Sequence, residues 1–199
     1  MKLNKLISSS YDVDIDSIML DSRQNQHNSI FFCLEGLSND AHDFVEQAIQ
    51  NGAVVVVHRH NDIYRDDQVI YHQVEDVMTT LHDVANRFYD YPSKKMTMFG
   101  ITGTNGKSTV MKTVRNILLR FGVNAGYIGT ISVEYGDKVI APSLTTPDIV
   151  ELNAYLNDMV KCGVTDVCLE VSSQGLALRR VEGIDFDNAS FTNLSHDHL

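Results

Sequence analysis

The stretch "GITGTNGKST", from Gly100 to Thr109, decides the fold, because its closely spaced glycines separate a strand-like run from a helix-like run. "KKMTMF" comes directly before it, and "VMKTVRNILLRFG" comes directly after it. Glycines at such a point let the backbone approach an anion, and the amides of the turn and of the following helix N-terminus point at its oxygens. The stretch therefore predicts a phosphate-binding loop between a strand and a helix.

Two side chains in this loop suit a nucleoside triphosphate. Lys107 supplies a point charge for the β- and γ-phosphates, and the Ser108 hydroxyl can reach a bound Mg²⁺. The strict GxxxxGK[ST] pattern would need a glycine at position 101, where this chain has Ile101. A glycine-rich turn followed by a chance Lys-Ser pair is the alternative, and the flanking strand and helix favour nucleotide binding over it.

Composition indicates an ordinary globular protein. The 199 residues allow one large or two small domains, and 43% of them are hydrophobic. No apolar run approaches the roughly 20 residues that span a bilayer, and the N-terminus lacks a signal-peptide core, so we expect a cytoplasmic protein without membrane insertion. A net charge of −10 without a basic block argues against a nucleic-acid surface.

The cysteines and histidines carry no metal or disulfide pattern. Cys33, Cys162 and Cys168 form no CxxC pair, and their apolar neighbours predict buried structural thiols. The histidines lack HxxxH and HExxH spacing, which makes a zinc site improbable. Those of the first segment are interpreted as surface or core residues: His27, His42, His58, His60, His72 and His82.

Strands and helices alternate along the chain, which predicts an α/β fold with a mostly parallel sheet and helices on both faces. The continuous β-branched run at 53–57 is typical of a strand buried on both faces. Pro92 ends a helix and places a domain boundary, giving domains 1–92 and 93–199. We expect strands at 29–34, 53–58, 68–73, 124–140 (around a Gly-Asp turn), 165–172 and 186–194, and helices at 41–52, 74–91 and 147–163.

Ligands of open α/β sheets gather at the carboxyl ends of the strands, so polar residues at those positions are candidates. Glu170 follows an apolar run, and a buried carboxylate needs a counter-charge, either Mg²⁺ or one of Arg179 and Arg180. Thr145 and Thr146, ahead of Pro147, are more often a helix N-cap than a ligand contact, and the two roles are compatible. Other polar residues at these positions are Ser172, Ser173, Asn193, His196, Asp197 and His198.

The first segment holds one such candidate, "MLDSRQ", with Asp21, Ser22 and Arg23 after a short apolar stretch. An arginine can hold a phosphate or carboxylate with two hydrogen bonds. A plain turn in which Asp21 pairs with Arg23 fits the same residues equally well.

Taken together, these motifs resemble those of the Mur ligases. "DSR", "GITGTNGKST", "LTTPD", "EVSSQGL" and "FTNLSHDHL" occur in the family's order, and the likeness runs from about Ser17 to Leu199. "GTNGK" is shared with all Mur ligases and with folylpolyglutamate synthase. "TTPD", "EVSS" and "TNLSHDHL" point to the branch that adds the third amino acid of the peptidoglycan peptide.

The resemblance implies an ATP-dependent amide ligase of cell-wall synthesis. Its N-terminal domain would bind the UDP-sugar, and its central domain would bind ATP. In this family the γ-phosphoryl group of ATP passes to UDP-MurNAc-L-Ala-D-Glu, and the amine of L-lysine or meso-diaminopimelate attacks the resulting acyl phosphate. Mg²⁺ is the implied cofactor. We expect a monomer, although no motif in the sequence determines the oligomeric state.

Carried onto this sequence, the resemblance assigns a role to each candidate. Lys107, Glu170 and His198 would be catalytic. Ser108, Glu170 and His198 would hold the metal. ATP would be bound by Gly103, Thr104, Asn105, Gly106, Lys107, Ser108 and Thr109, and the substrate by Ser22, Thr145, Thr146, Ser172 and Arg180.

The chain departs from the family in sequence and in length. Gln174, Leu178 and Ala41 replace the usual His, Gln and Gly, so the departures concern the implied peptide contacts more than the ATP contacts. The family has three domains, and this chain stops inside the second, so we expect a truncated form with doubtful turnover. A non-catalytic nucleotide-sugar-binding module and a folylpolyglutamate-synthase-like ligase are the alternatives.

Overall fold

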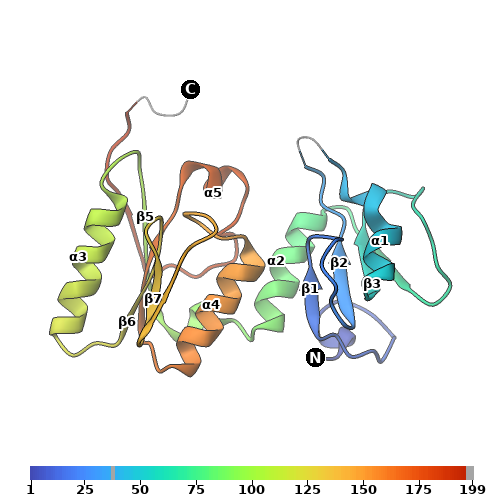
Figure 1. Ribbon diagram of the computed structural model, residues 1–199, viewed down its shortest axis with the longest axis horizontal. Coiled ribbons are helices and arrows are strands. Elements are labelled where there is room, and N and C mark those ends of the chain that lie inside the picture. Colours follow the sequence, from blue (N-terminus) through green and yellow to red (C-terminus); the bar gives the residue numbers. More distant parts are fainter. Residues whose placement is uncertain (37–38, 196–199) are drawn as a thin grey trace. The chain divides into compact units, whose positions relative to one another are not determined.

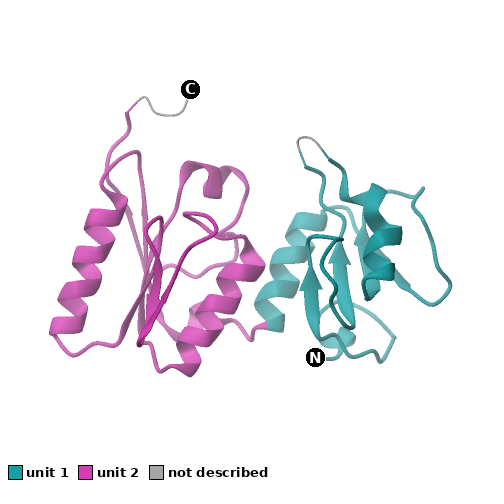
Figure 2. Ribbon diagram, viewed as in Figure 1, with its two compact units in different colours: residues 1–88 teal, residues 89–199 magenta. Residues whose placement is uncertain are grey.

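The computed structural model describes residues 1–36 and 39–195 of the chain. The chain forms two compact units, Met1–Phe88 and Tyr89–Leu199, shown in two colours in Figure 2. No helix within the described residues has the length and apolar character that a bilayer span requires.

Unit 1 is a four-stranded parallel sheet in the order β1-β2-β3-β4. Helices α1 and α2 lie on opposite sides of this sheet (Figure 1). The elements are η1 (Leu3–Lys5), β1 (Ser17–Met19), β2 (Ser29–Phe32), η2 (Ala41–Phe44), α1 (Val45–Gln50), β3 (Ala53–His58), β4 (Ile70–Gln73) and α2 (Val77–Phe88).

The core of unit 1 follows from its apolar runs. β3 is an inner strand, and five of its six residues are buried, as expected for a β-branched run in a parallel sheet. The side chains of Phe31 and Val56 meet those of Val45 and Ala48 from α1 in one cluster. The expected helix at 41–52 begins as the 3₁₀ turn η2 and becomes α-helical only at Val45.

Unit 2 is a six-stranded sheet in the order β10-β5-β9-β6-β7-β8, parallel from β10 to β6 and antiparallel from β6 to β8. Helices α3 and α4 lie on opposite faces of it (Figure 1). The elements are η3 (Pro92–Lys95), β5 (Thr97–Thr102), α3 (Lys107–Arg120), β6 (Ala125–Ile128), β7 (Val133–Tyr135), β8 (Lys138–Ile140), α4 (Ile149–Lys161), β9 (Asp166–Glu170), α5 (Ser173–Ala177) and β10 (Asn188–Phe191).

The parallel register brings the carboxyl ends of three strands to one edge. Ile101 of β5 pairs with Glu170 of β9, and Ile128 of β6 pairs with Leu169. The loops after β5, β6 and β9 therefore begin side by side. Glu170 is the last residue of β9, the phosphate loop follows β5, and Asn193 follows the neighbouring strand β10.

The start of α4 corrects one expectation. The helix is capped by Asp148, whose carboxylate accepts the amides of Val150 and Glu151, so neither Thr145 nor Thr146 is the cap. Pro147 lies ahead of the cap and outside the first helical turn. Aspartate is a better cap than threonine, and Asp148 directly precedes Ile149, the first residue of the helix.

Candidate nucleotide and substrate site

The phosphate loop, residues 103–109, runs from the end of β5 into the first turn of α3, which begins at Lys107. Gly103 and Gly106 have φ angles of 129° and 87°, which favour glycine. A Cβ on Gly103 would also lie 2.9 Å from the Asn193 carbonyl oxygen. Two of the three spaced glycines are therefore required by backbone conformation, and the turn between strand and helix has the predicted form.

Some backbone amides of the loop donate to protein acceptors, and others have no acceptor within the helix. Thr104 N–H donates to the Asn193 carbonyl at 2.9 Å, and Asn105 N–H donates to the Asn193 side-chain oxygen at 3.1 Å. The first-turn amides of α3 have no acceptor within the helix and remain available to an anion. Lys107 Nζ donates to the carbonyls of Gly103 and Thr104 at 2.7 and 3.0 Å, which holds the ammonium beside the loop.

Glu170, the last residue of β9, is fully buried and lies against this loop. Its Oε2 atom accepts hydrogen bonds from Ser108 Oγ at 2.9 Å and from Thr130 Oγ1 at 3.1 Å. Its Oε1 atom accepts from the hydroxyl of Tyr127. The loop is thus turned toward Glu170, and the carboxylate is surrounded by hydroxyl groups.

No arginine or lysine compensates this carboxylate among the described residues. Arg179 pairs with Glu182, and Arg180 donates to the carbonyl of Thr146 at 3.0 Å, so the alternative of a salt bridge to Glu170 does not hold. A buried carboxylate that has only hydroxyl partners is costly. Oxygen ligands of this kind suit a hard divalent cation, so Ser108 and Glu170 fit Mg²⁺.

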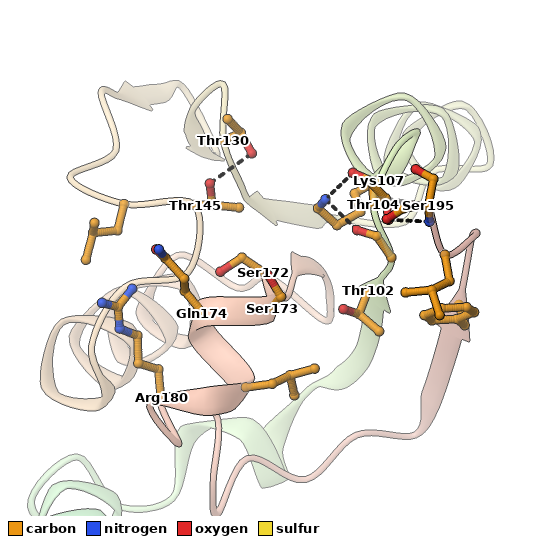
Figure 3. Close-up of a pocket in the computed structure, with 15 residues that line it drawn as sticks. Thr102, Thr104, Lys107, Thr130, Thr145, Ser172, Ser173, Gln174, Arg180 and Ser195 are labelled. Carbon is orange, nitrogen blue, oxygen red and sulfur yellow. Dashed lines mark hydrogen bonds between the residues drawn. The ribbon is translucent and has the colours of Figure 1, made fainter. Parts of the chain in front are cut away.

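A cavity of about 760 Å³ opens beside the loop (Figure 3). Lys107 and Thr104 line one side of it, while Thr145, Ser172 and Arg180 line another. Thr130 and Thr145 lie next to each other on the cavity wall and are joined by a hydrogen bond of 3.1 Å. Residues of the phosphate loop and three of the four candidate substrate residues of unit 2 thus share one cavity.

Thr146 is placed differently from its neighbour. It is fully buried, and its hydroxyl donates to the Glu170 carbonyl at 3.0 Å and accepts the Ser172 amide at 2.9 Å. Thr146 therefore fixes the turn after β9, while Thr145, Ser172 and Arg180 face the cavity. Ser172 also caps α5 by accepting the amide of Gly175 at 3.0 Å. Gln174, which departs from the family pattern, lines the cavity as well.

The candidates of unit 1 form a hydrogen-bonded turn. Arg23 donates to both carboxylate oxygens of Asp21, at 2.8 and 2.7 Å, as in the plain-turn interpretation. Ser22 is buried, and its hydroxyl donates to Gln47 Oε1 at 2.7 Å. His198, the remaining candidate of the metal set, lies outside the described residues.

The cysteine expectation is wrong at one position. Cys33 and Cys168 are buried, and burial raises the pKa of each thiol to about 12. Cys162 is exposed and is the C-cap residue of α4. Its adjacent residues are Lys161 and Gly163, and the apolar Val160 and Val164 two positions away did not bury it.

Three side chains of unit 1 come close enough to hold a metal ion: Asp40, His42 and His60. His42 Nδ1 bonds Asp40 Oδ1 at 2.6 Å, and its Nε2 accepts the amide of Arg59 at 3.1 Å. Both ring nitrogens of His42 are therefore occupied, and the group lacks a free imidazole ligand there.

Sequence reasoning missed Tyr127 and Thr130, the second and third hydroxyls on Glu170. Thr130 follows the apolar strand β6 and could have been found by the strand-end rule that found Glu170. Tyr127 lies inside β6 with no local feature to distinguish it from a core residue.

The strand, glycine turn and helix, with a buried carboxylate on the neighbouring strand, define an α/β protein of the phosphate-loop class. The profile described as Mur ligase middle domain matches residues 101–199, and that described as Mur ligase family, catalytic domain, matches residues 14–89. The chain belongs to the Mur ligase family.

Among its relatives are proteins named UDP-N-acetylmuramoyl-L-alanyl-D-glutamate--2,6-diaminopimelate ligase. That of Caldanaerobacter subterraneus is 42% identical over 97% of this chain and 40% of its own length, and that of Cytophaga hutchinsonii is 38% identical over the same shares. The chain therefore spans less than half the length of these relatives.

Solved structures agree with the fold. A structure with the same ligase title covers 100% of this chain and 41% of that one, with a TM-score of 0.82 and 25% identity. The MurF ligase of Thermotoga maritima in complex with ADP covers 79% of this chain and 32% of that one, with a TM-score of 0.52 and 22% identity.

Proposed function

We propose that this chain provides the nucleotide and muramoyl-peptide sites of an ATP-dependent ligase that extends UDP-MurNAc-L-Ala-D-Glu by a diamino acid. The single observation that carries the proposal is the shared cavity, which is lined by Lys107 of the phosphate loop and by Thr145, Ser172 and Arg180. Two reactants bound in one cavity can exchange a phosphoryl group without diffusion.

The described residues of unit 2 divide the work in this proposal. The first-turn amides of α3 and Lys107 hold the phosphates, and Ser108 and Glu170 hold Mg²⁺. The cation, when bound, neutralises charge on the transferring phosphoryl group. Arg180 donates to the Thr146 carbonyl through Nη1. Its remaining guanidinium nitrogens pair with a carboxylate of the peptide.

Five further assignments belong to the proposal. Unit 1 binds the uridine nucleotide around Ser22, and His198 completes the metal set. The relatives' names favour diaminopimelate over L-lysine as the incoming amine. ATP and nucleotide-activated sugars are found in the cytoplasm, and we place the reaction there. We also propose that the chain acts as a monomer.

Calorimetric titrations with Mg·ATP and with UDP-MurNAc-L-Ala-D-Glu test the division of roles. Lys107→Ala removes the ammonium and is expected to weaken Mg·ATP binding about tenfold or more. Arg180→Ala is expected to weaken binding of the muramoyl nucleotide by a similar factor and to leave Mg·ATP binding unchanged.

Lys138→Ala is the matched control. Lys138 is an exposed lysine on the edge strand β8, and its Nζ lies 2.5 Å from a carboxylate oxygen of Asp158. It should alter neither titration. Unchanged ATP binding in Lys107→Ala would contradict the proposal. Binding of the muramoyl nucleotide without ATP would favour a non-catalytic binding module instead.

A further inference from the structure

Tyr127 is a fully buried tyrosine whose hydroxyl lies against the end of the neighbouring strand. It pairs with Cys168 across β6 and β9. Glu170 comes two residues after Cys168 and therefore projects from the same face of the sheet. An aromatic side chain can reach this diagonal position. The Tyr127 hydroxyl accordingly bonds the Glu170 carboxylate 43 residues away.

The two carboxylate oxygens of Glu170 have separate partners. Oε1 accepts only the Tyr127 hydroxyl among the described residues, whereas Oε2 accepts Ser108 and Thr130 at 2.9 and 3.1 Å. Ser108 belongs to the phosphate loop, so Oε2 is the oxygen that faces the nucleotide side. The bond to Tyr127 thereby fixes the rotation of the carboxylate.

Gly129 leaves the space in which this bond is made. A Cβ at position 129 would lie 2.6 Å from Glu170 Cδ and 2.5 Å from the Tyr127 hydroxyl oxygen. Any larger residue would displace one of the two groups. The tyrosine ring itself is held in the core beside Ile101 and Met111, with Lys112 Nζ 5.1 Å from its centroid.

We propose that Tyr127 is a positioning residue for Glu170: its hydroxyl holds Oε1 so that Oε2 alone is presented to the magnesium of bound Mg·ATP. This inference rests on the proposed function, because it takes Glu170 and Ser108 as the holders of that cation. It adds Tyr127 and Gly129 as the groups that set the geometry of the carboxylate. Residues outside the immediate ligands commonly tune metal affinity in this way.

The test is the affinity for ATP measured by calorimetry in the presence of Mg²⁺ and again in excess EDTA. Tyr127→Phe deletes the hydroxyl and keeps the buried ring. We expect it to weaken ATP binding about tenfold in Mg²⁺ and to leave binding in EDTA unchanged. Gly129→Ala displaces the carboxylate instead of removing the bond, and we expect the same selective loss from it.

Two comparisons separate positioning from a general structural effect. In a Glu170→Gln background, Tyr127→Phe should have no further effect on ATP affinity, because the group it positions is gone. Tyr135→Phe is the matched control: Tyr135 is also a buried tyrosine, with its hydroxyl 2.7 Å from a carboxylate oxygen of Asp158, and its loss should leave both affinities unchanged.

The outcomes distinguish this inference from the function on which it rests. Full magnesium-dependent affinity in Tyr127→Phe and Gly129→Ala, or a loss that persists in EDTA or in the Glu170→Gln background, would overturn the role of Tyr127. Absence of magnesium-dependent ATP binding in the unmutated chain, or its survival in Glu170→Gln alone, would overturn the proposed function and this inference with it.

Discussion

Cys162 differs from the two other cysteines in its access to solvent. Cys33 directly follows β2 in the core of unit 1, and Cys168 lies inside β9; burial raises the pKa of each thiol to about 12. Cys162 follows the last turn of α4, beyond the residues that pack on the sheet. The reactive form of a cysteine is the exposed thiolate, so the three residues should react unequally.

We predict that a thiol reagent such as dithionitrobenzoate labels one of the three cysteines in the folded protein at neutral pH. Cys162→Ser should abolish the fast reaction, and denaturant should restore labelling at the two buried positions. Rapid labelling of Cys33 or Cys168 in the native state would show that their strands open more readily than their burial implies.

At the scale of elements, a charged cluster ties β7 to α3. Glu134 of β7 receives hydrogen bonds from Lys112 and Arg115 of α3, at 2.8 and 2.7 Å. Burial by itself would raise the pKa of Glu134, but the bond from Lys112, the bond from Ser132 and the charge of Arg115 hold it below its usual value. The antiparallel edge of the sheet is thus attached to the helix that carries the phosphate loop.

Because the pKa of Glu134 is lower in the folded chain than in the unfolded chain, its contribution to stability is present above its unfolded pKa, near 4.5. That contribution is lost as the pH falls through the lower, folded value. We predict that Glu134→Gln lowers the free energy of unfolding at pH 7 by about 2 kcal/mol.

Urea denaturation at a series of pH values measures this effect. The difference between Glu134→Gln and the unmutated chain should shrink as the pH falls below about 4.5. The exposed pair Lys95 and Asp90, 2.5 Å apart, offers a control, and Asp90→Asn should cost little at any pH. A difference that stays constant down to pH 3 would contradict an electrostatic role for Glu134.

At the scale of the whole molecule, each unit has a sheet of its own. The four strands of one lie within Met1–Phe88, and the six strands of the other lie within Tyr89–Leu199. No strand pairing joins the units among the described residues, so the backbone hydrogen bonds of each sheet are complete without the other unit. Each unit therefore meets the structural requirement for a separate domain.

We predict that residues 1–88 and residues 89–199, produced separately, both fold. Circular dichroism should show a cooperative thermal transition for each, and only the second fragment should bind Mg·ATP. An unfolded fragment 89–199 would mean that unit 2 needs surface from unit 1 for its stability.

The sequence by itself determined the features that depend on neighbouring residues. Glycine spacing and the Lys-Ser pair predicted the turn from β5 into α3, and the apolar run at 53–57 predicted an inner parallel strand. Alternating strands and helices predicted the fold class. These are local effects, because backbone conformation and burial periodicity are written in consecutive residues.

Only the tertiary structure decided which side chains meet. Thr145 and Thr146 are adjacent in sequence, yet Thr145 lines the cavity and Thr146 is fully buried. Glu170 meets Ser108 across 62 residues and Tyr127 across 43. Such contacts follow from strand order and register, which are set by the free energy of packing the whole sheet. The pattern of consecutive residues therefore does not show them.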